Sequence, residues 1–95
     1  MDQNKLQKLR KELADLRRSP QRARALESLA KRLGRKLVKR GKHPMWESTE
    51  FDWLFPLSIP HHRKDLPQKT RKSILDQLDT DIDAWDERLL EEDDG

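Results

Sequence analysis

The 95-residue sequence contains no cysteine, only three glycines and no long hydrophobic run. Without cysteine there is no disulfide framework, no thiolate zinc site and no cysteine nucleophile, and this composition fits a reducing compartment. The apolar stretches are far shorter than the roughly 20 residues of a transmembrane helix, and no apolar signal segment accompanies the basic N-terminal residues. Gly34, Gly41 and Gly95 are too scattered to form a phosphate-binding loop. We therefore expect a cytoplasmic protein without a membrane contact, and nucleotide-cofactor folds are unsupported.

Charge is abundant but unevenly distributed along the chain. Charged residues make up 41% of the sequence and hydrophobic residues 33%, which leaves room for one small domain. Residues 1–72 carry 20 of the 21 Lys and Arg residues and 8 acidic residues, whereas residues 73–95 carry Arg88 and 10 acidic residues. The basic part favours a polyanionic partner, because Lys and Arg contacts with phosphates supply most sequence-independent nucleic-acid affinity. The acidic end either restrains this basic surface or solvates one face of a helix.

Hydrophobic periodicity predicts two helices in the first third of the chain. Leucines recur at spacings of three and four over residues 3–18, which is the pattern of an amphipathic helix with a narrow apolar seam. Ser19 and Pro20 are typical of a helix start, and Gly34 suits the left-handed position that ends a helix. The second helix is therefore expected over residues 20–33.

The middle of the chain has the features of strands. Residues 35–42 contain two apolar side chains among basic ones and end near a glycine, so they predict a short strand and a turn. Every second residue over 51–59 is apolar, which is typical of a strand with one buried face. Pro56 and Pro60 each remove a hydrogen-bond donor from a sheet, so this segment is either an edge strand or a turn followed by a short strand at 57–59.

Pro67 marks the start of a third helix, expected over residues 68–90, with residues 91–95 expected to fray. The sequence thus predicts an α+β fold in which helices 20–33 and 68–90 pack on a small antiparallel sheet. Helix 3–18 lies across this sheet or pairs with another chain. The expected core consists of Leu26, Leu29, Leu33, Leu37, Phe55, Leu57, Ile59, Ile74, Leu78 and Ile82. The chain divides into a helical extension over 1–18, one domain over 19–90 and an acidic tail over 91–95.

Histidines are the only side chains that titrate near neutral pH without special perturbation. His43 precedes Pro44, which favours an extended backbone at residue 43, and the neighbouring cations favour a neutral imidazole that accepts a proton. The alternative is an exposed turn histidine without a chemical role. His61 and His62 are adjacent, so on a strand they point to opposite faces, and no third ligand has a suitable spacing. No metal site and no cofactor are expected.

The aromatic and acidic residues add one candidate site residue. Trp53 and Trp85 belong to the periodic patterns and are expected in the core, whereas Trp46 lies outside them, three residues from His43. Trp46 is therefore the candidate for stacking on a nucleic-acid base. The acidic residues of 76–87 follow a helical period and lack the glycine-bearing order of a calcium loop, so we expect a solvated helix face there and no cation site.

Three short motifs occur in a fixed order along the chain. They are Gly41-Lys42-His43 after the first predicted strand, Pro60-His61-His62 after the last one, and Thr70-Arg71-Lys72-Ser73-Ile74-Leu75 at the start of the third helix. In this order the motifs resemble those of the HicA toxin family of bacterial and archaeal toxin–antitoxin systems. The resemblance covers about residues 22–78.

The resemblance implies a small messenger-RNA-cleaving protein with a fold similar to the double-stranded-RNA-binding domain, three antiparallel strands with helices packed on one face. His43 matches the family's catalytic histidine and would act as general base or acid on the ribose 2′-hydroxyl, without metal or cofactor. Lys42, Arg40 and Lys39 would hold the phosphate. The residues expected to bind RNA are Lys36, Lys39, Arg40, Lys42, Trp46, His62, Arg63 and Lys64. The density of cations over residues 31–42 further predicts that binding depends on salt through the cluster Lys31, Arg32, Arg35, Lys36, Lys39, Arg40 and Lys42.

The implied partners are RNA and a cognate HicB-like antitoxin protein. An alternative function is a non-catalytic RNA-binding or protein-adaptor module of the same fold. A third interpretation is a homo-oligomer in which helix 3–18 forms the seam and the charge asymmetry guides the contact.

Overall fold

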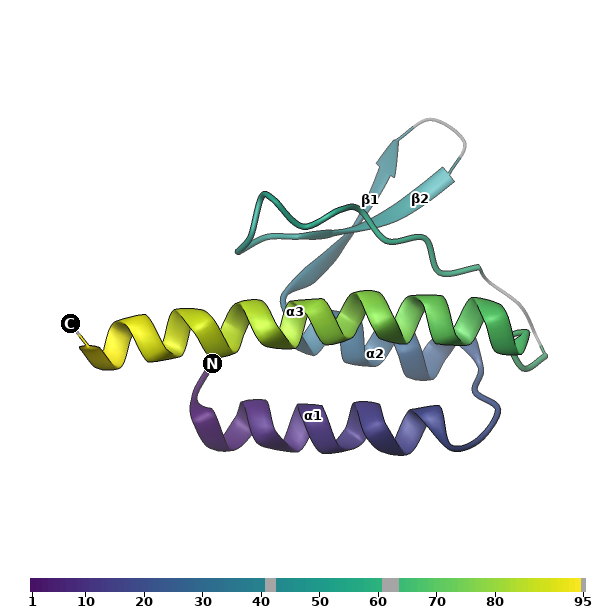
Figure 1. Cartoon of the computed structure of the whole chain (residues 1–95). Coiled ribbons are helices and arrows are strands. Elements are labelled where there is room, and N and C mark those ends of the chain that lie inside the picture. The colour runs from purple at the N-terminus through teal and green to yellow at the C-terminus, as the bar shows by residue number, and fades with distance from the viewer. Residues whose placement is uncertain (41–42, 61–63, 95) are drawn as a thin grey trace.

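The computed structural model contains three helices and one antiparallel strand pair in the part of the chain that it describes, residues 1–40, 43–60 and 64–94 (Figure 1). Side chains are described for all of these residues except Arg40, His43, Asp93 and Asp94. The elements are α1 (Gln3–Arg17), α2 (Ala23–Arg32), β1 (Arg35–Arg40), β2 (His43–Ser48) and α3 (Gln68–Asp94). The predicted α+β class is therefore confirmed.

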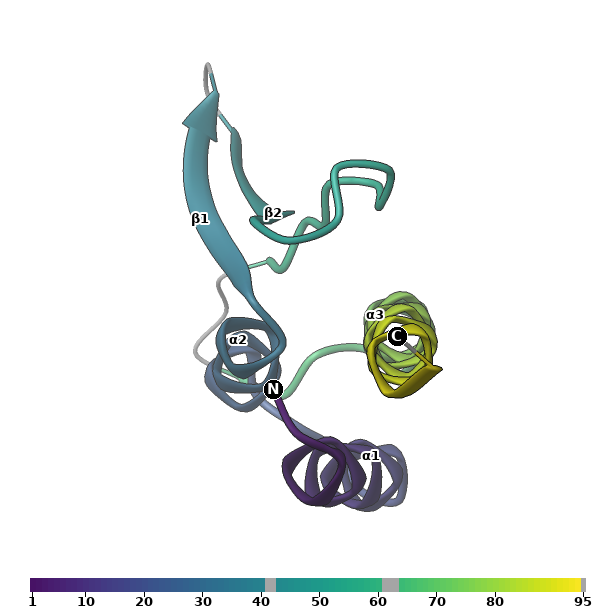
Figure 2. The same ribbon diagram turned by 90° about the vertical axis from the view of Figure 1, so that its left-hand side faces the viewer.

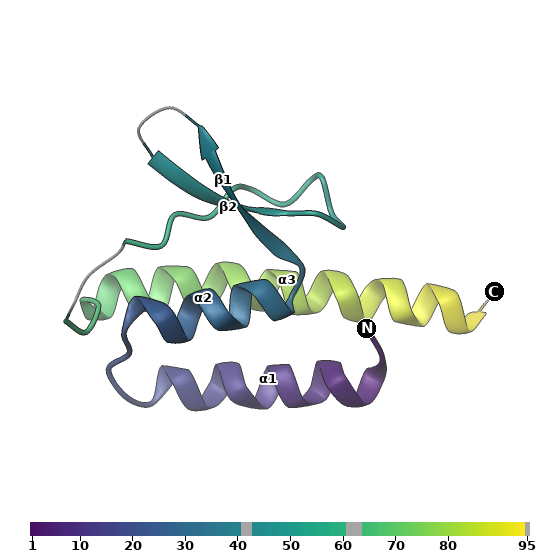
Figure 3. The same cartoon turned by 180° about the vertical axis from the view of Figure 1, so that it is seen from behind.

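The three helices form a bundle from which the hairpin projects. Seen along the helices in Figure 2, α1, α2 and α3 occupy the corners of a triangle, and the hairpin extends from the end of α2 away from α1. The rear view in Figure 3 shows α2 between the hairpin and α1. Ion pairs between Arg10 and Asp83 and between Arg17 and Asp76 show that α1 and α3 run antiparallel. The hairpin end remote from the helices is therefore remote from the main core.

One hydrophobic core joins all three helices. Leu6, Leu9 and Leu13 of α1 are at most 4% exposed, so the apolar seam of α1 is buried within this chain. The first helix was expected to lie across the sheet or to pair with another chain, but it packs against α3 on the side away from the hairpin. Of the ten predicted core residues, only Leu37 and Phe55 are not buried, with 43% and 83% of their surfaces exposed. The remaining buried apolar residues include Trp46, Phe51, Leu66, Leu75 and Leu89.

The helix ends depart from the sequence predictions at two places. α2 begins at Ala23 and not at residue 20, because the Gln21 carbonyl accepts a hydrogen bond from the Leu66 N–H, 2.8 Å away, and this segment is therefore extended. Gly34 has a φ of 97°, so its predicted left-handed position after α2 is confirmed. α3 continues to Asp94 where fraying was expected after residue 90, because buried Leu89 anchors its last turns and no glycine or proline interrupts them.

The sheet differs from the expected three strands. In the described residues β1 and β2 pair alone, and the predicted third strand is reduced to one bridge, in which Trp46 and Leu57 exchange hydrogen bonds of 2.7 and 2.9 Å. Before this bridge the chain turns: the Ser48 hydroxyl accepts from the Phe51 N–H at 3.1 Å, and Pro56 has no N–H to donate. The alternative prediction, a turn followed by a short extended segment, is the one that agrees with the structure.

Candidate nucleic-acid interface

The exposed cations of the expected RNA-binding set lie on the hairpin and before α3. Lys36 and Lys39 of β1 are exposed, as is Lys64. The register pairs Lys39 with Pro44 and Arg40 with His43, so the β2 backbone places His43 directly across from Arg40, at the end of the hairpin remote from the helices. The backbone thus brings the predicted histidine to the most basic part of the hairpin.

Several predicted site residues lie outside the described part of the structure. They are Gly41, Lys42, His61, His62 and Arg63, together with the side chains of Arg40 and His43. The structure therefore brings Lys39 and the backbone of His43 to the same end of the hairpin, whereas Lys36 lies opposite Glu47 nearer the helices, and the contribution of the others stays a prediction.

The tryptophans occupy environments opposite to those expected. Trp46, the predicted stacking residue, is only 4% exposed and packs in the core, with Lys31 Nζ 5.7 Å from its ring centroid. Trp53, expected in the core, is 59% exposed. The reason is the bridge between Trp46 and Leu57. The segment after the bridge covers Trp46, and residues 52–56 form an exposed loop before it. The exposed aromatic side chains are those of Trp53 and Phe55, and Pro56 is the sequence signal that this segment leaves the sheet.

Arg35, counted among the predicted phosphate contacts, is a buried structural residue. Its guanidinium pairs with both oxygens of Asp81 of α3, at 2.7 and 2.8 Å, and both side chains are 1% exposed. Arg35 Nη1 also donates to the carbonyls of Trp46 and Phe55, at 2.8 and 3.0 Å. Burial raises the pKa of Asp81, and the hydrogen bonds and charge of Arg35 oppose this shift. Arg35 thus joins β2, the loop and α3, and it is not available to a phosphate.

The acidic residues of α3 contact α1. Asp76 pairs with Arg17 at 2.8 Å, and Asp79 and Asp83 lie 3.8 and 3.5 Å from Arg10. These three carboxylates are at least 44% exposed, so the expected solvated face is present there, and it is the buried Asp81 that contradicts the expectation. Pairs between exposed charges of this kind contribute little each, about 0.2–1 kcal/mol. Their positions nevertheless direct the acidic side chains away from the hairpin.

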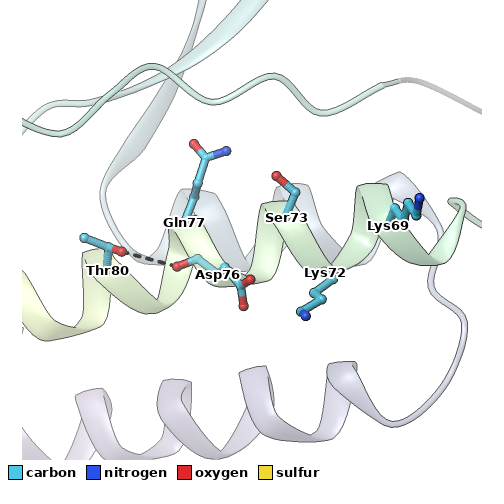
Figure 4. Close-up of a pocket in the computed structure, with 6 residues that line it drawn as sticks. All are labelled: Lys69, Lys72, Ser73, Asp76, Gln77 and Thr80. Carbon is cyan, nitrogen blue, oxygen red and sulfur yellow. Dashed lines mark hydrogen bonds between the residues drawn. The ribbon is translucent and has the colours of Figure 1, made fainter.

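Two adjoining cavities that share Gln77 form a groove between α3 and the segment that follows β2. One wall consists of Lys69, Ser73, Gln77 and Thr80, spaced by four, four and three residues along one face of α3. In Figure 4 Ser73 and Gln77 point toward the segment preceding α3, whereas Lys72 and Asp76 point toward α1. The opposite wall contains Trp53, Leu54, Phe55, Pro56, Ser58 and Pro60. No sequence pattern predicts this groove, because its walls come from separate parts of the chain.

No group of three or more His, Asp or Glu side chains suited to a metal ion occurs among the residues that the structure describes. His61 and His62 are outside those residues, so the prediction for them is not tested. No helix in the described ranges has the length and apolar character needed to cross a bilayer.

Comparisons with known proteins give no relative for this chain. No family model, no curated protein and no solved structure matches it.

Proposed function

We propose that this chain is a toxin-type RNA-cleaving protein of a toxin–antitoxin pair, which binds RNA through the β1–β2 hairpin and uses His43 for acid–base chemistry. The observation that carries the proposal is the hairpin register, which pairs His43 with Arg40 beside the exposed Lys39. A histidine near cations suits cleavage of a phosphodiester, because proton transfer and charge stabilisation are needed together.

The order of the elements also supports the proposal. From α2 onward the chain forms a helix, two antiparallel strands, a bridge at Leu57 and a helix. This is the order of the double-stranded-RNA-binding-like fold that the HicA resemblance implies, with the third strand shortened to one bridge. A HicB-like antitoxin is the protein partner that this function requires.

The proposed reaction needs only groups of the protein and the RNA. His43 removes the proton of a ribose 2′-hydroxyl, the 2′-oxygen attacks the adjacent phosphorus, and the bond from phosphorus to the 5′-oxygen breaks. The leaving 5′-oxygen takes up a proton, and the products are a 2′,3′-cyclic phosphate and a 5′-hydroxyl. Lys39 and Arg40 offset the negative charge that grows on the phosphate oxygens.

The direct test is incubation of the purified chain with end-labelled RNA in the presence of a chelator. We expect shortened fragments that end in a cyclic phosphate, because the proposed chemistry uses no metal ion. RNA binding without fragments would contradict the catalytic proposal and favour the non-catalytic RNA-binding module. Neither binding nor fragments would favour the protein-adaptor function.

Salt dependence tests the hairpin as the phosphate-binding surface. We expect Lys36→Ala and Lys39→Ala each to reduce the slope of log affinity against log salt by about 0.7–0.9, the contribution of one phosphate contact. The matched control is Lys8→Ala. Lys8 is an exposed lysine of α1, and α1 lies on the side of the helices away from the hairpin (Figure 1). Equal slopes for all variants in a titration by fluorescence anisotropy would contradict the assignment.

A further inference from the structure

We propose that the groove between α3 and residues 53–60 binds single-stranded RNA, with bases stacked on Trp53 and Phe55. This inference rests on the proposed function and extends it, since it names the strandedness of the substrate and a contact surface separate from the hairpin. It also replaces Trp46, which is buried, as the stacking residue.

The aromatic side chains are displayed from an anchored backbone. Phe55 is 83% exposed and Trp53 is 59% exposed, so neither ring is used to fill the core of this chain. The loop beneath them is nevertheless fixed: Arg35 donates to the Phe55 carbonyl at 3.0 Å, and the Leu54 N–H donates to the Phe51 carbonyl at 3.3 Å. Two exposed rings on a loop held by a buried ion pair form a preorganised stacking surface, and stacking of bases on such rings tolerates any base.

The helix wall supplies polar groups opposite the aromatic loop. Gln77 lines the groove with Trp53 and Phe55, and its amide offers both donors and acceptors to base edges, whereas Ser73 lines the part that contains Pro56 and Pro60. Lys69 lies at one end of the same helix face and provides a positive charge for a phosphate. Aromatic, amide and ammonium groups thus occur in the combination that recognises unpaired nucleotides.

Charge distinguishes RNA from a protein partner at this groove. In the described part of the chain the charged side chains that line it are Lys69 and Arg35, and the charge of Arg35 is offset by its buried pair with Asp81. Asp76 lines the adjoining cavity on the same helix, but it points toward α1 and pairs with Arg17 at 2.8 Å. Lys69 is therefore the exposed charge of the groove, and its sign suits a polyanion. Bases in a duplex are stacked on each other and cannot reach the two rings, so the occupant is a single strand.

The experiment compares the affinity of a short single-stranded RNA oligonucleotide for the full chain and for Trp53→Ala and Phe55→Ala. Each variant is expected to bind about 5- to 150-fold more weakly, the loss that corresponds to one stacked base. The salt slope should stay at the wild-type value, because neither ring contacts a phosphate. The matched control is Leu90→Ala, which removes an apolar side chain that is 55% exposed near the end of α3. Phe55→Ala and Leu90→Ala should unfold at the urea concentration of the wild type, since both residues are exposed, whereas Trp53→Ala also loses the edge-to-face contact of Trp53 with Phe51 and should unfold at a lower urea concentration.

The outcomes separate this inference from the function on which it rests. If the wild type binds RNA and both aromatic variants bind equally well, the groove inference is wrong and the loop is a contact for a protein, while the proposed function stands. An equal loss of affinity for a duplex of the same sequence would also overturn the inference, because it assigns the rings to unpaired bases. If the wild type binds no RNA, the proposed function itself fails.

Discussion

Replacement of Asp81 by alanine is expected to lower the free energy of unfolding by about 3–5 kcal/mol, because it leaves the Arg35 guanidinium buried without its counter-ion. Both side chains are 1% exposed, so water does not replace the lost carboxylate. Small domains have a total stability of about 5–15 kcal/mol, so this single change removes a large fraction of it. Urea unfolding followed by circular dichroism measures the effect.

Two further variants show whether burial of the charge causes the loss. Asp79 lies two residues away on α3, is 44% exposed and pairs with α1, so Asp79→Ala is the matched control and should cost no more than about 1 kcal/mol. The double variant Arg35→Met with Asp81→Leu removes both charges and should be more stable than Asp81→Ala. Equal stability of Asp81→Ala and Asp79→Ala would contradict the structural role given to the pair.

Replacement of His43 by alanine is expected to lower the rate of RNA cleavage by about 10²- to 10⁴-fold, the usual contribution of a general acid or base. RNA affinity should change little, because the phosphate contacts are assigned to lysines of the hairpin. Single-turnover cleavage at saturating protein separates the two quantities. In cells, the same variant should relieve the growth arrest that overexpression of the wild type is expected to cause.

A second histidine variant provides the control for His43. His62 belongs to the predicted RNA-binding set and not to the catalytic position, so His62→Ala should weaken binding and leave the rate at saturation near that of the wild type. The rate of the wild type should change with pH across the titration of one histidine, and that dependence should be absent in His43→Ala. Normal cleavage by His43→Ala would show that the assignment of the catalytic residue is wrong.

The sequence predicted the structure correctly where the stabilising interactions join residues close together in the chain. The spacing of leucines predicted α1 and the apolar face of α2, and Gly34 predicted the left-handed residue after α2, which has a φ of 97°. These features depend on residues within one or two helical turns of each other, so their pattern is visible along the chain. The basic character of β1 and its pairing with the following strand are local in the same sense.

The alternation of apolar residues over 51–59 predicted a strand that the structure does not contain. The reason lies in the tertiary structure. Phe51, Leu57 and Ile59 are buried as the period of two predicts, but Trp53 and Phe55 are exposed because the chain turns before Leu57 reaches Trp46. A strand requires a partner with free hydrogen-bonding groups, and only one residue of this segment exchanges hydrogen bonds with β2. The same bridge buried Trp46. The exposed aromatic side chains that can stack on a base are therefore Trp53 and Phe55, and not Trp46.

The sequence by itself determined the helices, the end of α2 and the concentration of cations before residue 73. Only the tertiary structure decided which charges remain at the surface. Arg35 and Asp81 are 46 residues apart in the chain, and nothing in their local sequence distinguishes them from the exposed charges around them. Their burial follows from the contact of the α2–β1 junction with α3, where Trp85 donates to the Leu33 carbonyl at 2.7 Å, because a buried charge requires a partner of opposite sign. That packing buries Arg35, at the start of β1, and leaves Lys36 and Lys39 exposed to a phosphate.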